Sequence, residues 1–211
     1  AAIGLRIEVL SGDDEARLSA TAVRCDPIWA KVPCLAVIDI GGGSTEVICD
    51  GLNQPCDGVR VSLQLGAVRL TDTCIKSDPP SDKELSDARR KSDEMLSAVT
   101  CPWPTGSGVA VGVGGTVVNL GAVCLASRNA ANVSLHVMEL AISDISGQIE
   151  HFASMPLEQR KHTPGLDPAR ADVITAGAII LERTMLRLGV ERIAVSCRGL
   201  RWGVLYERHG A

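Results

Sequence analysis

Short apolar runs separated by glycine-rich turns dominate the first half of the chain, and longer helical patterns dominate the second half. Residues 35–40 are apolar on both faces except at Asp39, and residues 45–49 return directly after three glycines. Residues 59–65 alternate between apolar and polar positions, which is typical of a half-buried strand. We therefore expect three consecutive strands connected as a meander.

Helices are expected on both sides of this meander. Ser11 is followed by acidic residues, which favour a helix start because the positive end of the helix dipole attracts them. Ser81 and Glu84 have the spacing of a capping box, which predicts a solvated helix over 81–99. The rest of the pattern predicts strands at 108–113 and 191–195, and helices at 117–126, 134–153, 168–188 and 200–208.

This order of elements indicates the fold class. Three strands followed by alternating helices and strands is the order of an RNase H-like α/β domain, a mixed sheet with helices on its faces. We expect that domain at 35–211 and interpret residues 1–34 as an arm or linker. The uncharged stretch 105–127 is long enough to span a membrane, but its glycines favour a strand, a turn and a helix instead.

Charge and composition exclude some classes of partner. The 21 Lys+Arg and 25 Asp+Glu give a formal net charge of −4, without a basic stripe. Only five side chains are aromatic (three Trp, one Tyr and one Phe), so base-stacking platforms are not expected. A general nucleic-acid binder is therefore disfavoured. Eight cysteines occur without a Cys-x-x-Cys pair, and we expect reduced, structural thiols in a cytoplasmic protein.

The segment from Asp39 to Glu46 is the sharpest candidate for chemistry. Its glycines allow the backbone to approach a bulky anion, and the two hydroxyls add hydrogen-bond donors. In a hairpin, Asp39 and Glu46 flank the mouth of the loop, and two carboxylates beside bound phosphates suit Mg²⁺. The alternative is a hairpin whose acids only hydrogen-bond the turn. The predicted phosphate-binding residues of this loop are Gly41, Gly42, Gly43, Ser44 and Thr45.

A second glycine-rich loop follows the strand at 108–113. Gly114, Gly115 and Thr116 stand where a helix begins, and N–H groups at a helix N-terminus attract phosphate. The dinucleotide-binding fingerprint would need a glycine at Val117, so it is absent. Close packing of helix on strand is the alternative. Two such loops at strand ends can clamp one polyanion.

These motifs resemble those of the exopolyphosphatase/guanosine pentaphosphate phosphatase family (Ppx/GppA). The likeness includes the segment from Asp39 to Glu46, the Glu15-Ala-Arg-Leu sequence, and residues 65–70 and 112–116. It continues through Pro164-Gly-Leu and Arg170-Ala-Asp to the closing Gly199-Leu-Arg-x-Gly. The family belongs to the superfamily of acetate and sugar kinases, Hsp70 and actin. In that superfamily two RNase H-like halves face each other across a phosphate-binding cleft.

The resemblance implies roles for individual residues. Glu15 matches the catalytic glutamate that activates the attacking water, and Asp39 and Glu46 match the Mg²⁺-site acids. Arg160 resembles a phosphate-contacting arginine, with a solvated basic loop as the alternative. We interpret Arg17, Arg69 and Arg201 first as ion-pair partners. Trp202 stands where the family usually has an acid.

The resemblance also implies a function. We expect a hydrolase that releases the terminal phosphate of polyphosphate, or the 5′ phosphate of guanosine pentaphosphate, with Mg²⁺ as cofactor. The family's first half is not in this sequence, so we expect a fragment that is weak or inactive alone and that partners the missing first domain, with a homodimer possible. An ATP-binding kinase or ATPase of the same superfamily, or a non-catalytic phosphate or nucleotide sensor, are the alternatives.

Overall fold

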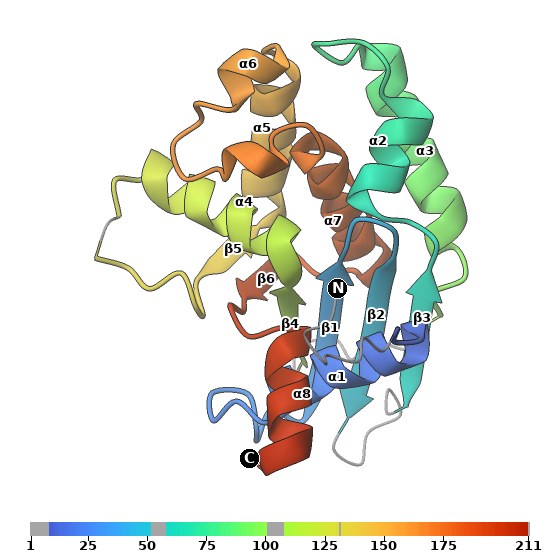
Figure 1. The fold of residues 1–211 in the computed structure, drawn as a ribbon, viewed down its shortest axis with the longest axis vertical. Coiled ribbons are helices and arrows are strands. Elements are labelled where there is room, and N and C mark those ends of the chain that lie inside the picture. The colour runs from blue at the N-terminus through green and yellow to red at the C-terminus, as the bar shows by residue number, and fades with distance from the viewer. Residues whose placement is uncertain (1–8, 52–57, 101–107, 131, 211) are drawn as a thin grey trace, which may run out of the picture.

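A mixed sheet forms the centre of the molecule (Figure 1). The computed structural model describes residues 9–51, 58–100, 108–130 and 132–210. In this part of the chain the sheet has six strands in the order β3-β2-β1-β4-β6-β5. The strands are β1 (Cys34–Ile40), β2 (Thr45–Gly51), β3 (Val59–Leu63), β4 (Gly108–Val113), β5 (Glu139–Ala141) and β6 (Arg192–Val195).

The strand directions confirm the predicted meander. β1 pairs antiparallel with β2, and β2 pairs antiparallel with β3. β4 adds to the other side of β1 in parallel, β6 adds to β4 in parallel, and β5 closes the edge in the antiparallel direction. The C-terminal ends of the parallel strands β1 and β4 therefore lie side by side at one edge of the sheet.

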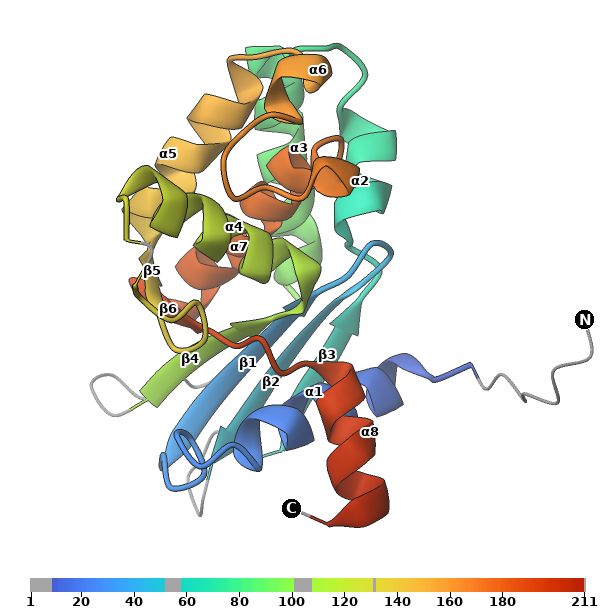
Figure 2. The same cartoon turned by 60° about the vertical axis from the view of Figure 1, so that its left-hand side comes forward.

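Helices cover both faces of this sheet (Figure 2). One face carries a large apolar core that includes Ile38 and Ile40 of β1 and is covered by α2, α3, α4, α5 and α7. The other face carries a smaller core around Leu35 and Val37, covered by α1, on which α8 packs. The helices are α1 (Gly12–Arg24), α2 (Ala67–Cys74), α3 (Asp82–Leu96), α4 (Gly114–Ser127), α5 (Ile142–Ala153), α6 (Leu157–Arg160), α7 (Ile174–Leu188) and α8 (Leu200–His209), with a 3₁₀ turn at Pro168–Arg170.

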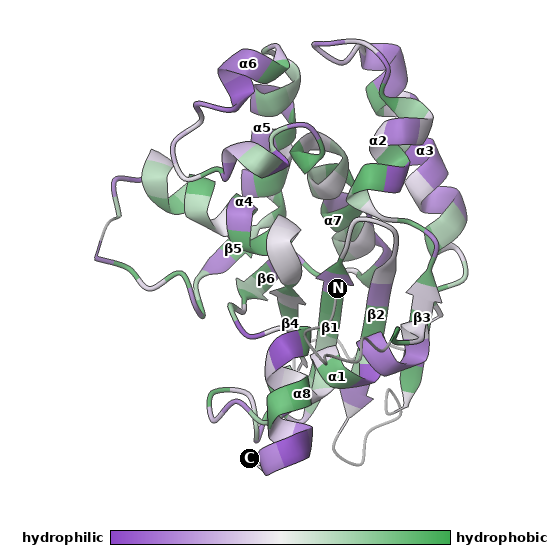
Figure 3. Ribbon diagram, in the orientation of Figure 1, coloured by the Kyte–Doolittle hydropathy of each residue, from purple (hydrophilic) through white to green (hydrophobic). Residues whose placement is uncertain are grey.

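Hydropathy follows these layers. Figure 3 shows β1 and β4 largely in green, whereas α3 carries much purple. β1 and β4 are apolar on both faces because helices cover both faces, which is the pattern of central parallel strands. α3 buries only a stripe formed by Leu85, Ala88, Ser92 and Leu96.

The helix starts predicted at Ser11 and Ser81 are confirmed, and several short elements were missed. Ser11 caps α1 by accepting a hydrogen bond from the Asp14 N–H, and Ser81 forms the capping box with Glu84. The sequence did not predict α2 or α6. The first part of the predicted helix 134–153 contains strand β5, and a 3₁₀ turn precedes α7 in the predicted helix 168–188.

Residues 1–34 were expected to form an arm or linker, but helix α1 within them packs on the sheet. Ala16, Ala20 and Val23 of this helix are buried against Leu35 and Val37 of β1. A linker would leave these side chains in water. Residues 12–24 are therefore an integral layer of the domain.

The cysteines correct a second expectation. Cys34 is disulfide-bonded and so is Cys49, so the prediction of reduced thiols is wrong for each of them. The free thiols among the described residues are those of Cys25, Cys74, Cys124 and Cys197. Disulfides persist mainly in oxidising compartments. Reduced cysteines therefore no longer support the expectation of a cytoplasmic protein, which stays a prediction.

The stretch that raised the membrane alternative folds, over residues 108–127, as strand β4 and helix α4. Among the residues that the structure describes, no helix combines the length and apolar character needed to cross a membrane.

Candidate active site at the end of β1

Two carboxylates face each other across the β1–β2 hairpin. Asp39 pairs with Glu46 in the antiparallel register. Directly opposite residues lie on the same face of a sheet with Cβ atoms about 5 Å apart. The tight turn from Gly41 to Ser44, closed by a 2.9 Å hydrogen bond from the Gly41 N–H to the Ser44 carbonyl, sets this register. The sequence prediction that both acids flank the mouth of this loop is confirmed.

Both carboxylates are held by hydroxyl groups and have no cationic partner among the described residues. Ser19 of α1 donates to Asp39 Oδ2 at 2.6 Å, and Ser62 of β3 donates to Glu46 Oε1 at 2.9 Å. No arginine, lysine or histidine in the described part of the chain forms an ion pair with either acid.

Burial raises the pKa of both acids. It raises the pKa of Asp39, and the hydrogen bond from Ser19 opposes this shift. It also raises the pKa of Glu46, which is only 3% exposed, and the hydrogen bonds from Ser62 and Ser44 oppose it. Buried negative charge without a counter-charge is unfavourable, so this pair favours the arrival of a cation.

Glu15 lies on the same side of the sheet as this pair. It stands one turn before Ser19 on α1, and residues four apart share a helix face. The start of α1 rests on β3, because a Cβ built on Gly12 would lie 2.6 Å from Ser62 Oγ. The charge of Glu15 also contributes to the raised pKa of Glu46. The structure therefore brings Glu15, Asp39 and Glu46 to one region, as predicted.

The second glycine loop meets Asp39 directly. Gly114 has a φ of +85°, a conformation that glycine adopts without strain, and a Cβ at this position would lie 2.5 Å from Asp39 Oδ1. The same Cβ would lie 3.4 Å from the Ile40 carbonyl oxygen, so the loop after β1 and the loop after β4 start next to each other. α4 starts here without a side-chain cap and without an acid in its first turn. Its first N–H groups are therefore available to an anion.

A cavity of about 390 Å³ opens beside Asp39, Gly114 and Gly115. Arg170 and Arg201 line it, and neither forms an ion pair with any residue that the structure describes. α8 also starts at this cavity without a side-chain cap, and a Cβ on its N-cap residue Gly199 would lie 3.9 Å from the Gly114 nitrogen. Two helix N-termini and two unpaired guanidinium groups make this cavity a site for an anion.

The carbonyls of the first glycine loop are used by α2, and the predicted phosphate contacts of Gly41, Gly42, Gly43 and Ser44 remain a prediction. The carbonyl of Gly41 accepts from the Ala67 N–H, and that of Gly42 accepts from the N–H groups of Val68 and Arg69. These bonds cap the start of α2. Gly42 and Gly43 border a separate, open cavity of about 500 Å³ beside α2.

Two predicted phosphate-binding hydroxyls point elsewhere. Thr45 is fully buried, and its hydroxyl donates to the Leu65 carbonyl, because it precedes Glu46 and therefore faces the opposite side of β2. Thr116 is 3% exposed, and its hydroxyl donates to the Ile40 carbonyl at 3.4 Å. Both predictions are corrected: these hydroxyls fasten the two loops to the core.

The predicted phosphate contact of Arg160 is also corrected. Its side chain is 3% exposed, in α6, which lies far from β1 in Figures 1 and 2. Its guanidinium donates to the carbonyls of Phe152 at 2.9 Å, Met155 at 2.9 Å and Ala171 at 3.0 Å. Burial lowers its pKa. Arg160 therefore holds the turn after α5 together and does not reach the site.

Arg170 and Arg201 occupy the position that sequence reasoning gave to Arg160. A Cβ on Gly115 would lie 2.7 Å from the Arg170 guanidinium carbon, so this arginine lies across the start of α4. Of the three arginines interpreted as ion-pair partners, Arg17 bonds Glu207 at 3.0 Å, whereas Arg69 donates to the Gly43 carbonyl and Arg201 lines the cavity. For Arg201, the sequence contained a signal for this position, since it directly follows Gly199-Leu200, where helix α8 begins.

The donor set fits Mg²⁺. No group of three or more His, Cys, Asp and Glu side chains in the described ranges could hold a metal alone. Asp39 and Glu46 supply two oxygen donors, and Mg²⁺ usually takes one or two carboxylates and completes its shell with water and phosphate oxygens. Burial raises the pKa of both acids, and a bound cation would stabilise their charged forms.

A family model of the Ppx/GppA phosphatase family matches residues 1–210. The chain belongs to this family. It is 32% identical to Exopolyphosphatase 2 of Mycobacterium tuberculosis over 198 residues, covering 92% of this chain and 61% of the relative. It is 31% identical to Exopolyphosphatase 1 of Mycobacterium leprae over 207 residues, covering 97% of this chain and 60% of the relative.

A solved structure shows the same fold. The crystal structure of the Aquifex aeolicus member of the Ppx/GppA family superposes with a TM-score of 0.84 at 30% identity, covering 98% of this chain and 65% of that chain. The expected α/β fold, the RNase H-like fold of the actin and Hsp70 superfamily, is confirmed. The chain spans about 60% of the length of the curated relatives it matches.

Proposed function

We propose that the site at the end of β1 binds a run of phosphoryl groups with Mg²⁺, and that the protein releases the terminal phosphate by hydrolysis. The substrate is inorganic polyphosphate, or the 5′ phosphate of guanosine pentaphosphate. The observation that carries this proposal is the contact between Gly114 and Asp39, which joins a carboxylate that suits a metal to an uncapped helix start. The names of the mycobacterial relatives support the same class of substrate.

Each group has a distinct task in this proposal. Asp39 and Glu46 hold Mg²⁺, which when bound neutralises the charge of phosphate oxygens. The first N–H groups of α4 and the guanidinium groups of Arg170 and Arg201 bind and orient the phosphates. Glu15 accepts the proton of the attacking water as the general base, because its carboxylate lies on the same side of the sheet as Asp39 and Glu46.

The test separates binding from chemistry. Binding of tripolyphosphate is measured by calorimetry with Mg²⁺ and with EDTA, and phosphate release is measured from long-chain polyphosphate with the longest natural form of the protein. Glu15→Gln is expected to retain binding and to abolish release. Asp13→Asn is the matched control, since Asp13 is an exposed acid in the first turn of the same helix.

Two outcomes would contradict the proposal. Release by Glu15→Gln at the wild-type rate would remove Glu15 from its catalytic role. Binding of tripolyphosphate that is equal with Mg²⁺ and with EDTA would remove Asp39 and Glu46 from a metal site. The chain in isolation is expected to bind more weakly than the longest natural form, since relatives carry additional length.

A further inference from the structure

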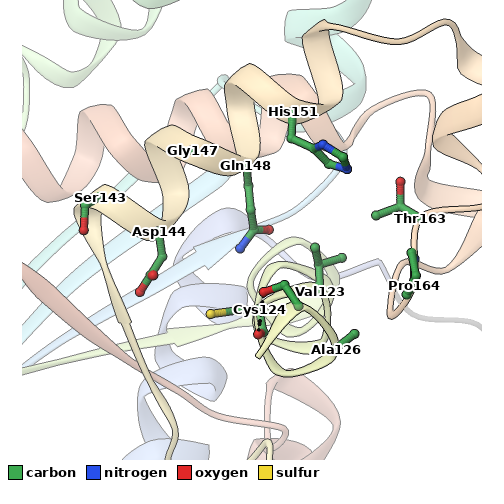
Figure 4. A pocket seen from close by; sticks show the side chains of 11 residues that line it. Val123, Cys124, Ala126, Ser143, Asp144, Gly147, Gln148, His151, Thr163 and Pro164 are labelled. Atoms are coloured by element: carbon green, nitrogen blue, oxygen red, sulfur yellow. Dashed lines mark hydrogen bonds between the residues drawn. The ribbon is translucent and has the colours of Figure 1, made fainter. Parts of the chain in front are cut away.

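A third cavity, of about 440 Å³, lies between α4, α5 and residues 161–170, which we call the elbow (Figure 4). It lies beside the last residues of α4, whereas the candidate active site lies at the first residues. α4 has 14 residues and is therefore about 20 Å long. None of the residues that line one cavity lines the other.

The elbow is fixed tightly against α4, so this cavity is preformed. Gly165 has a φ of +87°, and a Cβ there would lie 2.4 Å from the Ala122 carbonyl oxygen. The Asp167 N–H donates to Asn119 Oδ1 at 2.7 Å. Preformed cavities of this size are typical of small-molecule sites.

One buried acceptor in the wall has no partner. Gln148 is 8% exposed, and its Nε2 donates to the Leu120 carbonyl at 3.1 Å, but its Oε1 accepts no hydrogen bond from any described residue. Figure 4 shows this amide directed from α5 toward α4, among the side chains that line the cavity. A buried acceptor without a donor is unfavourable, so a ligand that supplies an N–H group gains affinity here.

Two other polar groups of the wall already have partners. Asp144 accepts from Arg128 at 2.7 Å and from the Ala141 N–H at 2.9 Å. The Ser127 hydroxyl donates to the Cys124 carbonyl at 2.9 Å. Of these three groups, only Gln148 has a buried polar atom that a ligand can complete.

The remaining wall suits a flat apolar body. Val123, Ala126 and Pro164 give an aliphatic surface, and the His151 ring stands beside Gln148 in Figure 4. A glutamine amide carries two N–H groups, so Gln148 retains one donor beside its free acceptor. This donor–acceptor edge is complementary to a carboxamide or lactam.

We propose that this cavity binds a small uncharged aromatic molecule with a carboxamide or lactam group, whose N–H donates to Gln148 Oε1. Such binding is independent of the phosphate chemistry proposed at the end of β1. Benzamide is the probe, and benzoate is the matched ligand, because a carboxylate has the same shape but no N–H donor. Binding is followed by saturation-transfer NMR of the ligand and by titration.

Benzamide is expected to bind with a Kd on the order of 1 mM, as suits a ligand of this size, and benzoate at least about tenfold more weakly. The absence of saturation transfer to benzamide at ten times that concentration would overturn the proposal. Equal affinity for the two ligands would overturn the role of Gln148 Oε1.

Substitutions in α5 locate the site. Gly147 lines the cavity and a Cβ there would meet no atom within 4 Å, so Gly147→Leu places a larger side chain at the cavity wall and is expected to abolish binding. Gly147→Ala is its control and is expected to bind benzamide normally. Gln148→Met keeps the shape, removes the acceptor and is expected to weaken benzamide binding about tenfold. Unchanged binding in Gly147→Leu, confirmed as folded by its melting curve, would place the ligand elsewhere and refute the proposal.

Discussion

Replacement of Gly114 by alanine tests how the second loop meets Asp39. At a φ of +85° an L-residue is strained by about 1–2 kcal/mol. The new Cβ would also lie 2.5 Å from Asp39 Oδ1, so the carboxylate must move and loses the 2.6 Å hydrogen bond from Ser19, which is worth about 1–2 kcal/mol. Together these effects lower the free energy of unfolding by about 3 kcal/mol.

For a domain of this size, that loss lowers Tm by roughly 6–12 °C. Gly147→Ala makes the same chemical change in a helix with open space around it, and is expected to raise Tm by about 2–4 °C through helix propensity. Both melting curves are measured by calorimetry in EDTA, and binding of tripolyphosphate is measured with Mg²⁺. A Tm for Gly114→Ala equal to or above that of the wild type would refute the reasoning about this contact.

Three further predictions concern Glu46, the arginines and the disulfide-bonded cysteines. Because burial raises the pKa of Glu46, the folded protein holds this proton more tightly than the unfolded chain, so stability falls as the pH rises from the ordinary glutamate value through the raised one. In EDTA, Glu46→Gln removes this fall and raises Tm at about pH 7.5; a Tm below that of the wild type at that pH would contradict it. Arg170→Met is expected to weaken tripolyphosphate binding about tenfold with little change in Tm. Arg160→Met leaves buried carbonyls without donors and is expected to lower the free energy of unfolding by about 2–4 kcal/mol. A melting curve and a tripolyphosphate titration of each variant test this, and weaker binding in Arg160→Met with a lower Tm in Arg170→Met would contradict both assignments. Reduction with dithiothreitol is expected to lower the stability by about 2–4 kcal/mol through Cys34 and Cys49, and an unchanged Tm after complete reduction would contradict a stabilising role.

The parts of the fold that depend on local signals were predictable. Three glycines between two apolar runs force a tight hairpin, and the hairpin register then sets Asp39 opposite Glu46. Ser81 and Glu84 fix the start of α3 through contacts within one turn. In these cases the interacting residues are close in sequence, so composition and spacing contain the necessary information.

The parts that depend on tertiary contacts were not predictable. α2 has eight residues, and its first N–H groups are satisfied by carbonyls of Gly41 and Gly42, which lie in another loop. Arg160 and Arg170 stand in the same proline-containing region, and only the packing of the elbow on α4 decides which one reaches the site. The pairing state of Cys34 and Cys49 likewise depends on which segments the fold brings together.

The close contact between α1 and α8 has a consequence for folding during synthesis. A Cβ on Gly203 would lie 2.0 Å from the Leu18 carbonyl oxygen, so the last helix docks on the first with backbone nearly touching backbone. Almost the whole described chain lies between these two residues, and contacts of such sequence separation form late. While the ribosome is still making α8, α1 lacks this partner, and the side of α1 that α8 later covers is exposed to water and chaperones.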